Sequence, residues 1–180
     1  MIRLKSLIKE ITDTDLKRIL QKIREKQFSL FGQGDNGRVY EINGEDKLFK
    51  ITTEQEEYRV ADQIVNKYSN FTTFIPVYYV DGKNMYIMGK ASDLSENEKI
   101  KIDQFIASYK NYAREQGGEV SIFDYLDAEG GRNTDVQIVN FLRALQRDIR
   151  KLDIPDLDLD LDFKTDNVML WNNKMVMIDW

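Results

Sequence analysis

Glycines at a regular spacing precede a lysine in the first third of this sequence. Residues Gly32-Gln33-Gly34-Asp35-Asn36-Gly37-Arg38-Val39 follow the pattern G-x-G-x-x-G-x-V, and Lys50 stands thirteen residues after Gly37. Glycine is needed where the backbone approaches an anion closely, and the N–H groups of such a loop can cover the phosphates of a nucleotide. A tight turn uses the same residue types. The spacing therefore indicates a phosphate-binding hairpin only in combination with residues elsewhere.

A second group of polar residues stands near the other end of the sequence. Residues Asp162-Phe163-Lys164-Thr165-Asp166-Asn167 fit the pattern D-x-K-x-x-N, and Asp179 follows twelve residues after Asn167. The two groups carry a resemblance to the protein-kinase-like phosphotransferases, in which similar motifs occur in the same order. The resemblance covers about residues 28–180. The resemblance assigns a part to four residues: Lys50 is similar to the lysine of the third strand, Asp162 to the catalytic aspartate, Asn167 to the metal-binding asparagine and Asp179 to the first residue of D-F-G.

The same resemblance implies ATP and Mg²⁺ as cofactors. The backbone from Gly34 to Gly37 would lie over the phosphates, Lys50 would contact the α- and β-phosphates, and Asn167 with Asp179 would hold magnesium. Asp162 would accept or orient the proton of the acceptor hydroxyl, while Lys164 would stabilise charge that develops on the transferred group. These roles predict an enzyme that transfers a phosphoryl group.

The acceptor is predicted from finer similarities. A lysine two residues after the catalytic aspartate resembles Ser/Thr protein kinases, so we expect a minimal kinase of protein Ser/Thr hydroxyls, similar in size to abbreviated phage and bacterial-effector kinases. Ile178-Asp179-Trp180 resembles the I-D-W of aminoglycoside and choline kinases, which leaves a small-molecule phosphotransferase as an alternative. The activation segment and A-P-E motif do not follow Asp179. A kinase fragment, or a non-catalytic module that binds nucleotide or a protein, also remains open.

Composition narrows the classes of function. The chain has 180 residues, a net charge of −5 and a pI near 5.0. Nucleic-acid binding depends on clustered Lys and Arg, so we expect no nucleic-acid partner. The sequence has neither cysteine nor histidine, which excludes disulfides, thiolate metal sites, cysteine nucleophiles and histidine bases. Carboxylates, amides and lysines must carry any chemistry.

Targeting signals are not evident in this sequence. No apolar run is long enough to cross a bilayer, and Met1-Ile2-Arg3-Leu4-Lys5 lacks the apolar core of a signal peptide. We therefore expect a cytoplasmic protein without membrane contact, in the host cytoplasm if it is phage-encoded or a secreted effector. A protein substrate or regulatory protein is the expected partner, and the oligomeric state is not predicted.

Periodicity predicts the elements that carry the glycine hairpin. Apolar residues at helical spacing predict two short amphipathic helices, over residues 4–11 and 16–23, with an N-cap between them within 12–15. From Phe28 to Ile51, β-branched and aromatic residues between turn signals predict three antiparallel strands joined by hairpins. The glycine pattern is the first of these turns.

Residues 54–68 predict a helix with one acidic residue on its apolar side. Glu57 falls on the same side as Ala61 and Ile64. A carboxylate that faces inward is costly unless it is paired, and the resemblance supplies Lys50 as its partner. Glu54 borders the same stripe and is the second candidate. Only six residues separate Lys50 from Glu57, a shorter link than protein kinases use.

A second hairpin, over residues 75–88 with Asp81-Gly82 as its turn, would complete a five-stranded sheet. By resemblance, Met88 lies near the gatekeeper position and Gly89-Lys90-Ala91 forms the hinge that holds adenine. The predicted nucleotide-binding residues are therefore Gly32, Gly34, Gly37, Val39, Lys50, Glu57, Met88 and Lys90.

The last third of the sequence predicts helices and one more hairpin. Helical spacing marks residues 102–109 and 138–152, the second helix with an N-cap at Asn133-Thr134. Residues 168–171 and 175–178 are expected to pair across Asn172-Asn173, with the indole of Trp180 beside the nucleotide.

The expected fold class is α+β, a bilobal protein-kinase-like fold. It has a five-stranded antiparallel N-lobe sheet with one helix and a truncated, mainly helical C-lobe. The expected divisions are a helical extension over residues 1–27, the N-lobe over 28–89 and the C-lobe over 90–180. No role is predicted for residues 117–131.

Overall fold

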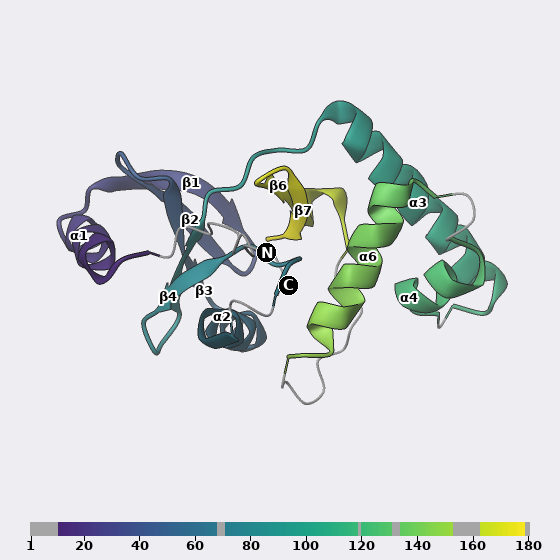
Figure 1. Cartoon of the computed structure of the whole chain (residues 1–180), viewed down its shortest axis with the longest axis horizontal. Coiled ribbons are helices and arrows are strands. Elements are labelled where there is room, and N and C mark those ends of the chain that lie inside the picture. The colour runs from purple at the N-terminus through teal and green to yellow at the C-terminus, as the bar shows by residue number, and fades with distance from the viewer. Residues whose placement is uncertain (1–10, 68–70, 119, 131–133, 153–162, 179–180) are drawn as a thin grey trace, which may run out of the picture.

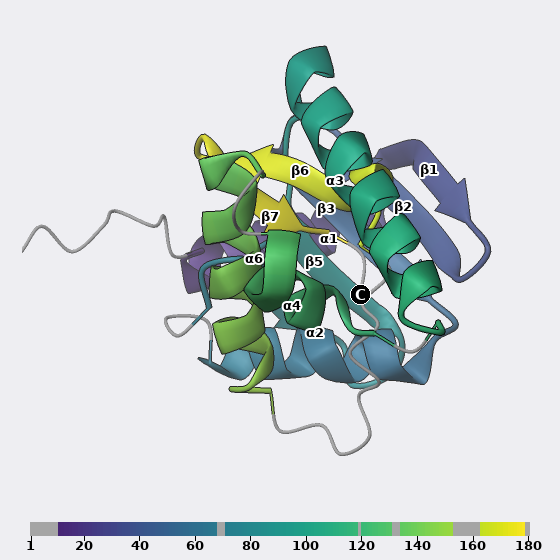
Figure 2. The ribbon, with the colours of Figure 1, turned by 90° about the vertical axis from the view of Figure 1, so that its right-hand side faces the viewer.

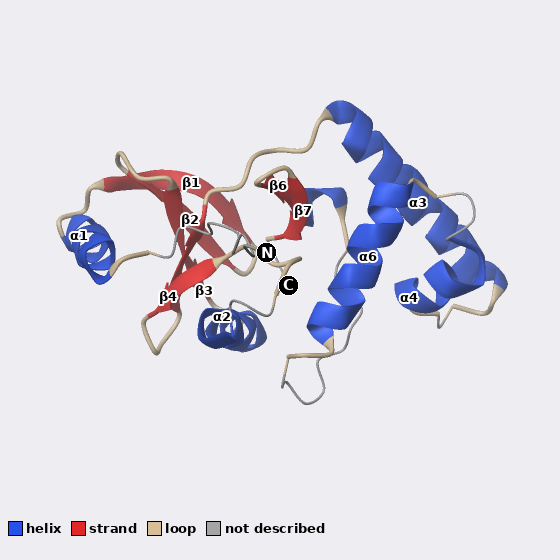
Figure 3. Ribbon diagram, in the orientation of Figure 1, coloured by secondary structure: helices blue, strands red, loops and turns tan. Residues whose placement is uncertain are grey.

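The computed structural model describes residues 11–67, 71–118, 120–130, 134–152 and 163–178. A five-stranded antiparallel sheet lies at one end of the molecule, and the longest helices lie at the other (Figure 1, Figure 3). The predicted α+β class is therefore confirmed, as is the predicted antiparallel sheet of five strands.

The strand order of the sheet is β1-β2-β3-β5-β4. The strands are β1 (Phe28–Gly34), β2 (Gly37–Ile42), β3 (Lys47–Thr52), β4 (Val77–Val80) and β5 (Met85–Gly89). β3 pairs with β2 on one side and with β5 on the other, so that Lys50 lies opposite both Val39 and Tyr86. β3 is therefore an inner strand, and its register with both neighbours fixes the position of Lys50 in the sheet.

Helices cover both faces of this sheet. Successive side chains on a strand point to opposite faces, and here Phe49 packs on the side of helix α1 (Asp13–Arg24) while Leu48 packs on the side of helix α2 (Gln55–Lys67). Thr12 caps α1, as predicted, by accepting the Asp15 N–H at 3.1 Å. The helix expected over residues 4–11 lies almost wholly outside the described residues.

The helical end of the molecule contains α3 (Glu96–Glu115), α4 (Ile122–Tyr125), the π-helical turn η2 (Leu126–Gly130) and α6 (Val136–Ile149). Figure 2 shows α3 and α6 in front of the sheet, with α1 behind it. The segment for which the sequence predicted no role contributes buried Ile122, Phe123 and Leu126 to the main core.

The N-cap of α6 differs from the prediction. Asp135 caps the helix by accepting the Gln137 N–H at 2.8 Å, so the cap lies one residue beyond the predicted pair at 133–134. Asp135 also accepts a bond from Lys101 of α3 at 2.7 Å.

The predicted C-terminal hairpin is present and lies between the sheet and the helices (Figure 1). Strands β6 (Val168–Trp171) and β7 (Lys174–Met177) are joined by Asn172 and Asn173, whose φ angles of 51° and 61° suit a two-residue hairpin turn.

Backbone hydrogen bonds join this hairpin to the segments before β4 and after β5. Leu170 and Ser92 exchange two bonds, at 2.8 and 2.9 Å. The Met177 N–H donates to the Thr73 carbonyl at 2.7 Å, and the Ile75 N–H donates to the Met177 carbonyl at 2.9 Å. The hairpin is therefore placed by residues far away in the sequence.

A buried carboxylate holds the segment before β4 to α6. Oδ2 of Asp148 accepts the backbone N–H groups of Thr72 and Thr73, at 2.6 and 3.0 Å, and both of their hydroxyls. Its Oδ1 accepts the Lys151 ammonium at 2.5 Å. Within the described ranges, no helix is long and apolar enough to span a membrane.

Asp148→Asn should lower the free energy of unfolding by about 2 kcal/mol at pH 7, because it removes a charge that accepts several hydrogen bonds. Burial alone would raise the pKa of Asp148, but the Lys151 ammonium and the donors of Thr72 and Thr73 outweigh burial and hold the pKa below its usual value. A lowered pKa stabilises the fold above the unfolded-state pKa and ceases to do so as the pH falls through the folded-state value. In urea unfolding, the difference between wild type and variant should therefore shrink below about pH 4.

The matched control is Asp62→Asn, which changes an exposed carboxylate of α2. It should change the free energy of unfolding by less than about 0.5 kcal/mol at either pH. A loss at Asp148→Asn that persists undiminished at about pH 3 would contradict the role of its charge.

Candidate functional site

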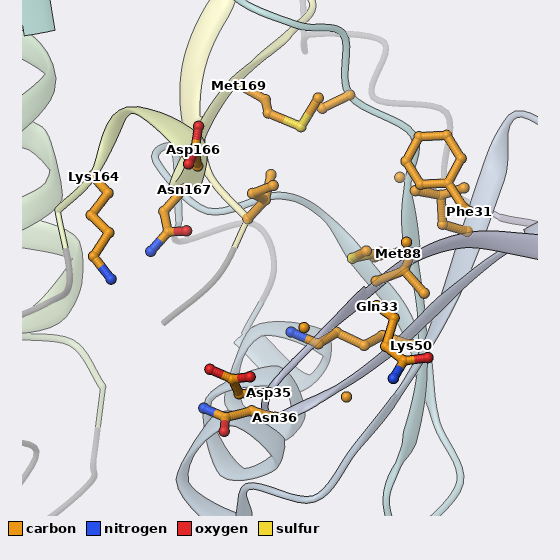
Figure 4. A pocket seen from close by; sticks show the side chains of 18 residues that line it. Phe31, Gln33, Asp35, Asn36, Lys50, Met88, Lys164, Asp166, Asn167 and Met169 are labelled. Atoms are coloured by element: carbon orange, nitrogen blue, oxygen red, sulfur yellow. The ribbon is translucent and has the colours of Figure 1, made fainter. Parts of the chain in front are cut away.

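A cavity of about 690 Å³ lies between the β1–β2 hairpin and the residues around β6. Figure 4 shows Lys164 and Asn167 on one side of it, and Asp35, Asn36 and Lys50 on the other. Its lining comes from residues 31–50, from the end of β5 and the residues after it, and from residues 164–178. The lining residues are Phe31, Gly32, Gln33, Gly34, Asp35, Asn36, Gly37, Val39, Leu48, Lys50, Met88, Gly89, Ala91, Lys164, Asp166, Asn167, Met169 and Ile178. The size suits a small-molecule ligand.

The three glycines of the hairpin have two different roles. A Cβ atom on Gly37 would lie 2.5 Å from the Ile51 carbonyl oxygen, so this glycine lets the hairpin lie directly on the backbone of β3. A Cβ on Gly32 or Gly34 would meet nothing within 4 Å. Neither packing nor backbone conformation explains these two glycines, and both line the cavity. Side chains there would fill space that is open to a ligand.

The predicted pair of Lys50 and Glu57 is present. The Lys50 ammonium lies 2.6 Å from Oε1 of Glu57, and the two side chains are 8% and 2% exposed. Lys50 lines the cavity from β3, while Glu57 lies behind it on the buried side of α2. Glu54, the second candidate, is exposed before the helix begins. The pair therefore holds the Lys50 ammonium in a set position at the edge of the cavity.

Two hydroxyls complete the surroundings of Glu57. The Thr52 hydroxyl donates to Oε2 at 2.6 Å, and the Tyr86 hydroxyl donates to Oε1. Thr52 and Tyr86 are fully buried. The carboxylate is thereby hydrogen-bonded on both oxygens, which offsets the cost of removing it from water.

The opposite side of the cavity is formed by the segment before β6. Lys164, Asp166 and Asn167 line the cavity there (Figure 4). The short 3-10 turn η3 (Thr165–Asn167) is held by a bond from the Thr165 hydroxyl to Asp103 of α3. The Ile178 N–H donates to the Asn167 carbonyl at 3.0 Å. Two residues predicted from the D-x-K-x-x-N motif, Lys164 and Asn167, thus face the predicted glycine hairpin and Lys50.

Apolar side chains line the end of the cavity next to β5: Val39, Leu48, Met88, Met169 and Ile178. Such a lining suits a flat, uncharged ring. Met88 and Val39, two of the predicted nucleotide-binding residues, are thus part of the cavity lining.

Of the predicted hinge residues, Gly89 and Ala91 line the cavity and Lys90 does not. The Lys90 ammonium pairs with Glu41, and its N–H donates to the Asp46 carbonyl at 3.3 Å. The indole of Trp171 covers Gly89 so closely that a Cβ there would lie 2.7 Å from it. Trp171 thus lies beside this site, and the prediction for Trp180 concerns a residue outside the described residues.

Asp162 and Asp179, the predicted catalytic and metal-binding aspartates, also lie outside the described residues. Among the residues that the structure does describe, no three carboxylates cluster as a metal site. The cavity does present oxygen donors on Asn167 and Asp166. These hard donors fit Mg²⁺, which usually takes only one or two protein carboxylates together with phosphate oxygens and water.

Several residues of the site were missed from the sequence, although some signals were there. Leu48 and Thr52 stand two residues on either side of Lys50, and alternate residues of a strand share a face. Met169 had no such signal, because Asn167 lies in η3 and not on β6. Tyr86 had no such signal, because its contact with Glu57 depends on the register between β3 and β5.

Comparisons with known proteins give little further information. No protein-family model and no curated protein matches this sequence. Among solved structures, the chain is similar to one described as the streptomycin–ATP–APH(2″)-IIa ternary complex. The identity is 14%, the match covers 99% of this chain and 71% of that chain, and the TM-score is 0.36. At this score the similarity supports no functional conclusion, so the assignment depends on the cavity.

Gly37→Ala should lower the free energy of unfolding by about 1–3 kcal/mol, because the added methyl group would press on the backbone of β3. Gly34→Ala meets open space and should change it by less than about 1 kcal/mol. Urea unfolding of both variants measures the contrast. Equal losses would show that the two glycines have the same structural role.

Proposed function

We propose that this protein binds ATP with Mg²⁺ in the described cavity and transfers its γ-phosphoryl group to a hydroxyl. The observation that carries this proposal is the meeting of four features in one cavity: the open glycine hairpin, Lys50 held by buried Glu57, an apolar end, and Lys164 with Asn167 opposite. We further propose that residues 28–89 and 90–180 act as two lobes that share this cavity.

Each feature has a part that follows from its chemistry. The apolar end next to Met88 would accept the adenine ring, and the backbone at Gly32 and Gly34 would approach the phosphates. Lys50 would contact phosphate oxygens, because Glu57 fixes its ammonium at the cavity edge. When bound, Mg²⁺ supplies positive charge that neutralises the phosphates. Asn167 would be one of its ligands, and Asp179 is proposed as another.

Transfer requires a group that receives the acceptor. We propose Asp162 for this role, since it stands two residues before Lys164, which lines the cavity. Lys164 would stabilise charge on the transferred group. We propose a protein Ser/Thr hydroxyl as the acceptor, on the similarity of Lys164 to the lysine of Ser/Thr protein kinases. A small-molecule alcohol and a non-catalytic nucleotide-binding module are the alternatives.

Millimolar Mg-ATP should raise the melting temperature of the wild type through mass action. Lys50→Met and Asn167→Ala should each remove most of this shift, since they delete a phosphate contact and a metal ligand. Lys83→Met, an exposed lysine in the β4–β5 turn, is the matched control and should keep it. If Lys50→Met does not fold because Glu57 has lost its ammonium partner, Asn167→Ala still tests the proposal. A wild type that does not respond to Mg-ATP would contradict the proposal.

Asp162→Asn should keep the Mg-ATP melting shift and reduce phosphoryl transfer by at least about 100-fold, because the residue is assigned to the acceptor hydroxyl rather than to the metal. Radiolabelled ATP with protein extracts, aminoglycosides and choline-like alcohols distinguishes the acceptor classes. Transfer to a small alcohol alone would favour the first alternative. ATP binding without transfer to any acceptor would favour the non-catalytic module.

A further inference from the structure

The short link between β3 and α2 contains a hydroxyl with three contacts. Thr52, the last residue of β3, accepts the Glu54 N–H on its Oγ1 at 3.0 Å. The same oxygen lies 2.6 Å from Glu57 Oε2 and 3.1 Å from the Asn36 carbonyl. A hydroxyl has one hydrogen to donate, and the shorter, charge-assisted bond identifies Glu57 as its main acceptor.

This arrangement explains how so short a link works. α2 begins at Gln55, three residues after β3 ends. Because Thr52 accepts the Glu54 N–H, its hydroxyl directs the chain into the helix, and the same hydroxyl then meets the carboxylate one turn further on. One side chain therefore contacts both the start of α2 and Glu57.

The tip of the glycine hairpin is held by the same link. The Asn36 carbonyl accepts the Thr53 N–H at 2.8 Å, and the Thr53 hydroxyl lies 3.2 Å from it. Gly37 lies directly on the backbone of Ile51 and Thr52. Two neighbouring residues thus contact both parts of the site. Thr53 holds the hairpin over the proposed phosphates, and Thr52 holds the carboxylate that pairs with Lys50.

Tyr86 holds the other oxygen of the carboxylate. It lies opposite Lys50 in the β3–β5 pairing, is fully buried, and donates its hydroxyl to Glu57 Oε1, which also accepts Lys50. Rotation of the carboxylate would break a bond at each oxygen. These bonds hold Glu57 at both oxygens, and Lys50, which pairs with it, is held at the cavity edge.

We propose that Thr52 and Tyr86 are positioning residues that fix the Glu57 carboxylate so that Lys50 is already placed for phosphate binding in the ligand-free protein. This inference rests on the proposed nucleotide site and adds to it two residues that touch neither nucleotide nor acceptor. Its consequence is selective: binding of phosphates should depend on these hydroxyls, and binding of the base and ribose should not.

The test compares the affinities of Mg-ATP and adenosine, measured by calorimetry, in four variants. Thr52→Val and Tyr86→Phe each remove one hydroxyl with little change of shape, and Thr52→Ser keeps the hydroxyl. Thr14→Val, on the exposed surface of α1 and outside the cavity lining, is the matched control. Thr52→Val and Tyr86→Phe should weaken Mg-ATP binding by about tenfold and adenosine binding by less than about twofold, as expected for loss of one hydrogen bond to a charged group. Thr52→Ser and Thr14→Val should keep the wild-type ratio of the two affinities.

The outcomes separate this inference from the function on which it rests. A wild type that binds no Mg-ATP would overturn both. In a second outcome, the wild type binds Mg-ATP, and both hydroxyl-deleted variants weaken the binding of ATP and of adenosine equally. This result would show that the hydroxyls serve only the fold, and it would overturn the positioning role alone. Unchanged affinities would overturn it equally. Tyr86→Phe keeps the test decisive if Thr52→Val does not fold.

Discussion

The buried carboxylate of Glu57 is the constraint on which the rest of the site depends. Removing a carboxylate or an ammonium from water costs several kcal/mol of free energy for each ion. Only close pairing and further hydrogen bonds offset this cost. Glu57 obtains these from Lys50, Thr52 and Tyr86. Because the three partners lie on β3 and β5, the ion pair fixes where α2 sits on the sheet. Such a pair is weak evidence for stability, and here it holds the Lys50 ammonium at the edge of the cavity.

The other side of the cavity depends on contacts of a different kind. A two-stranded hairpin is at best marginally stable by itself, and β6–β7 is held by backbone bonds to Thr73, Ile75 and Ser92. Asp148 in turn holds Thr73 through four donors shared with Thr72. A buried polar group of the helical part thereby supports the hairpin that directly follows Asn167 in the chain.

Much of this architecture could be predicted from local patterns. Turn residues marked the hairpins, period-two alternation marked the strands, and helical spacing placed Glu57 on the inner side of α2. The pairing with Lys50 followed because an inward carboxylate needs a cation. Local patterns did not report the long-range contacts, such as the pairs of Asp135 with Lys101 and of Lys90 with Glu41.

The sequence by itself determined which elements form and which residue types could bind phosphate, since helix and strand periods and the steric freedom of glycine are local properties. Only the tertiary structure decided that the hairpin at Gly34 and the segment at Asn167 face the same cavity, and that Thr52 and Tyr86 hold Glu57. The reason is physical: strand register and the docking of β6–β7 follow from packing and hydrogen bonds between residues far apart in the chain, which no local period reports.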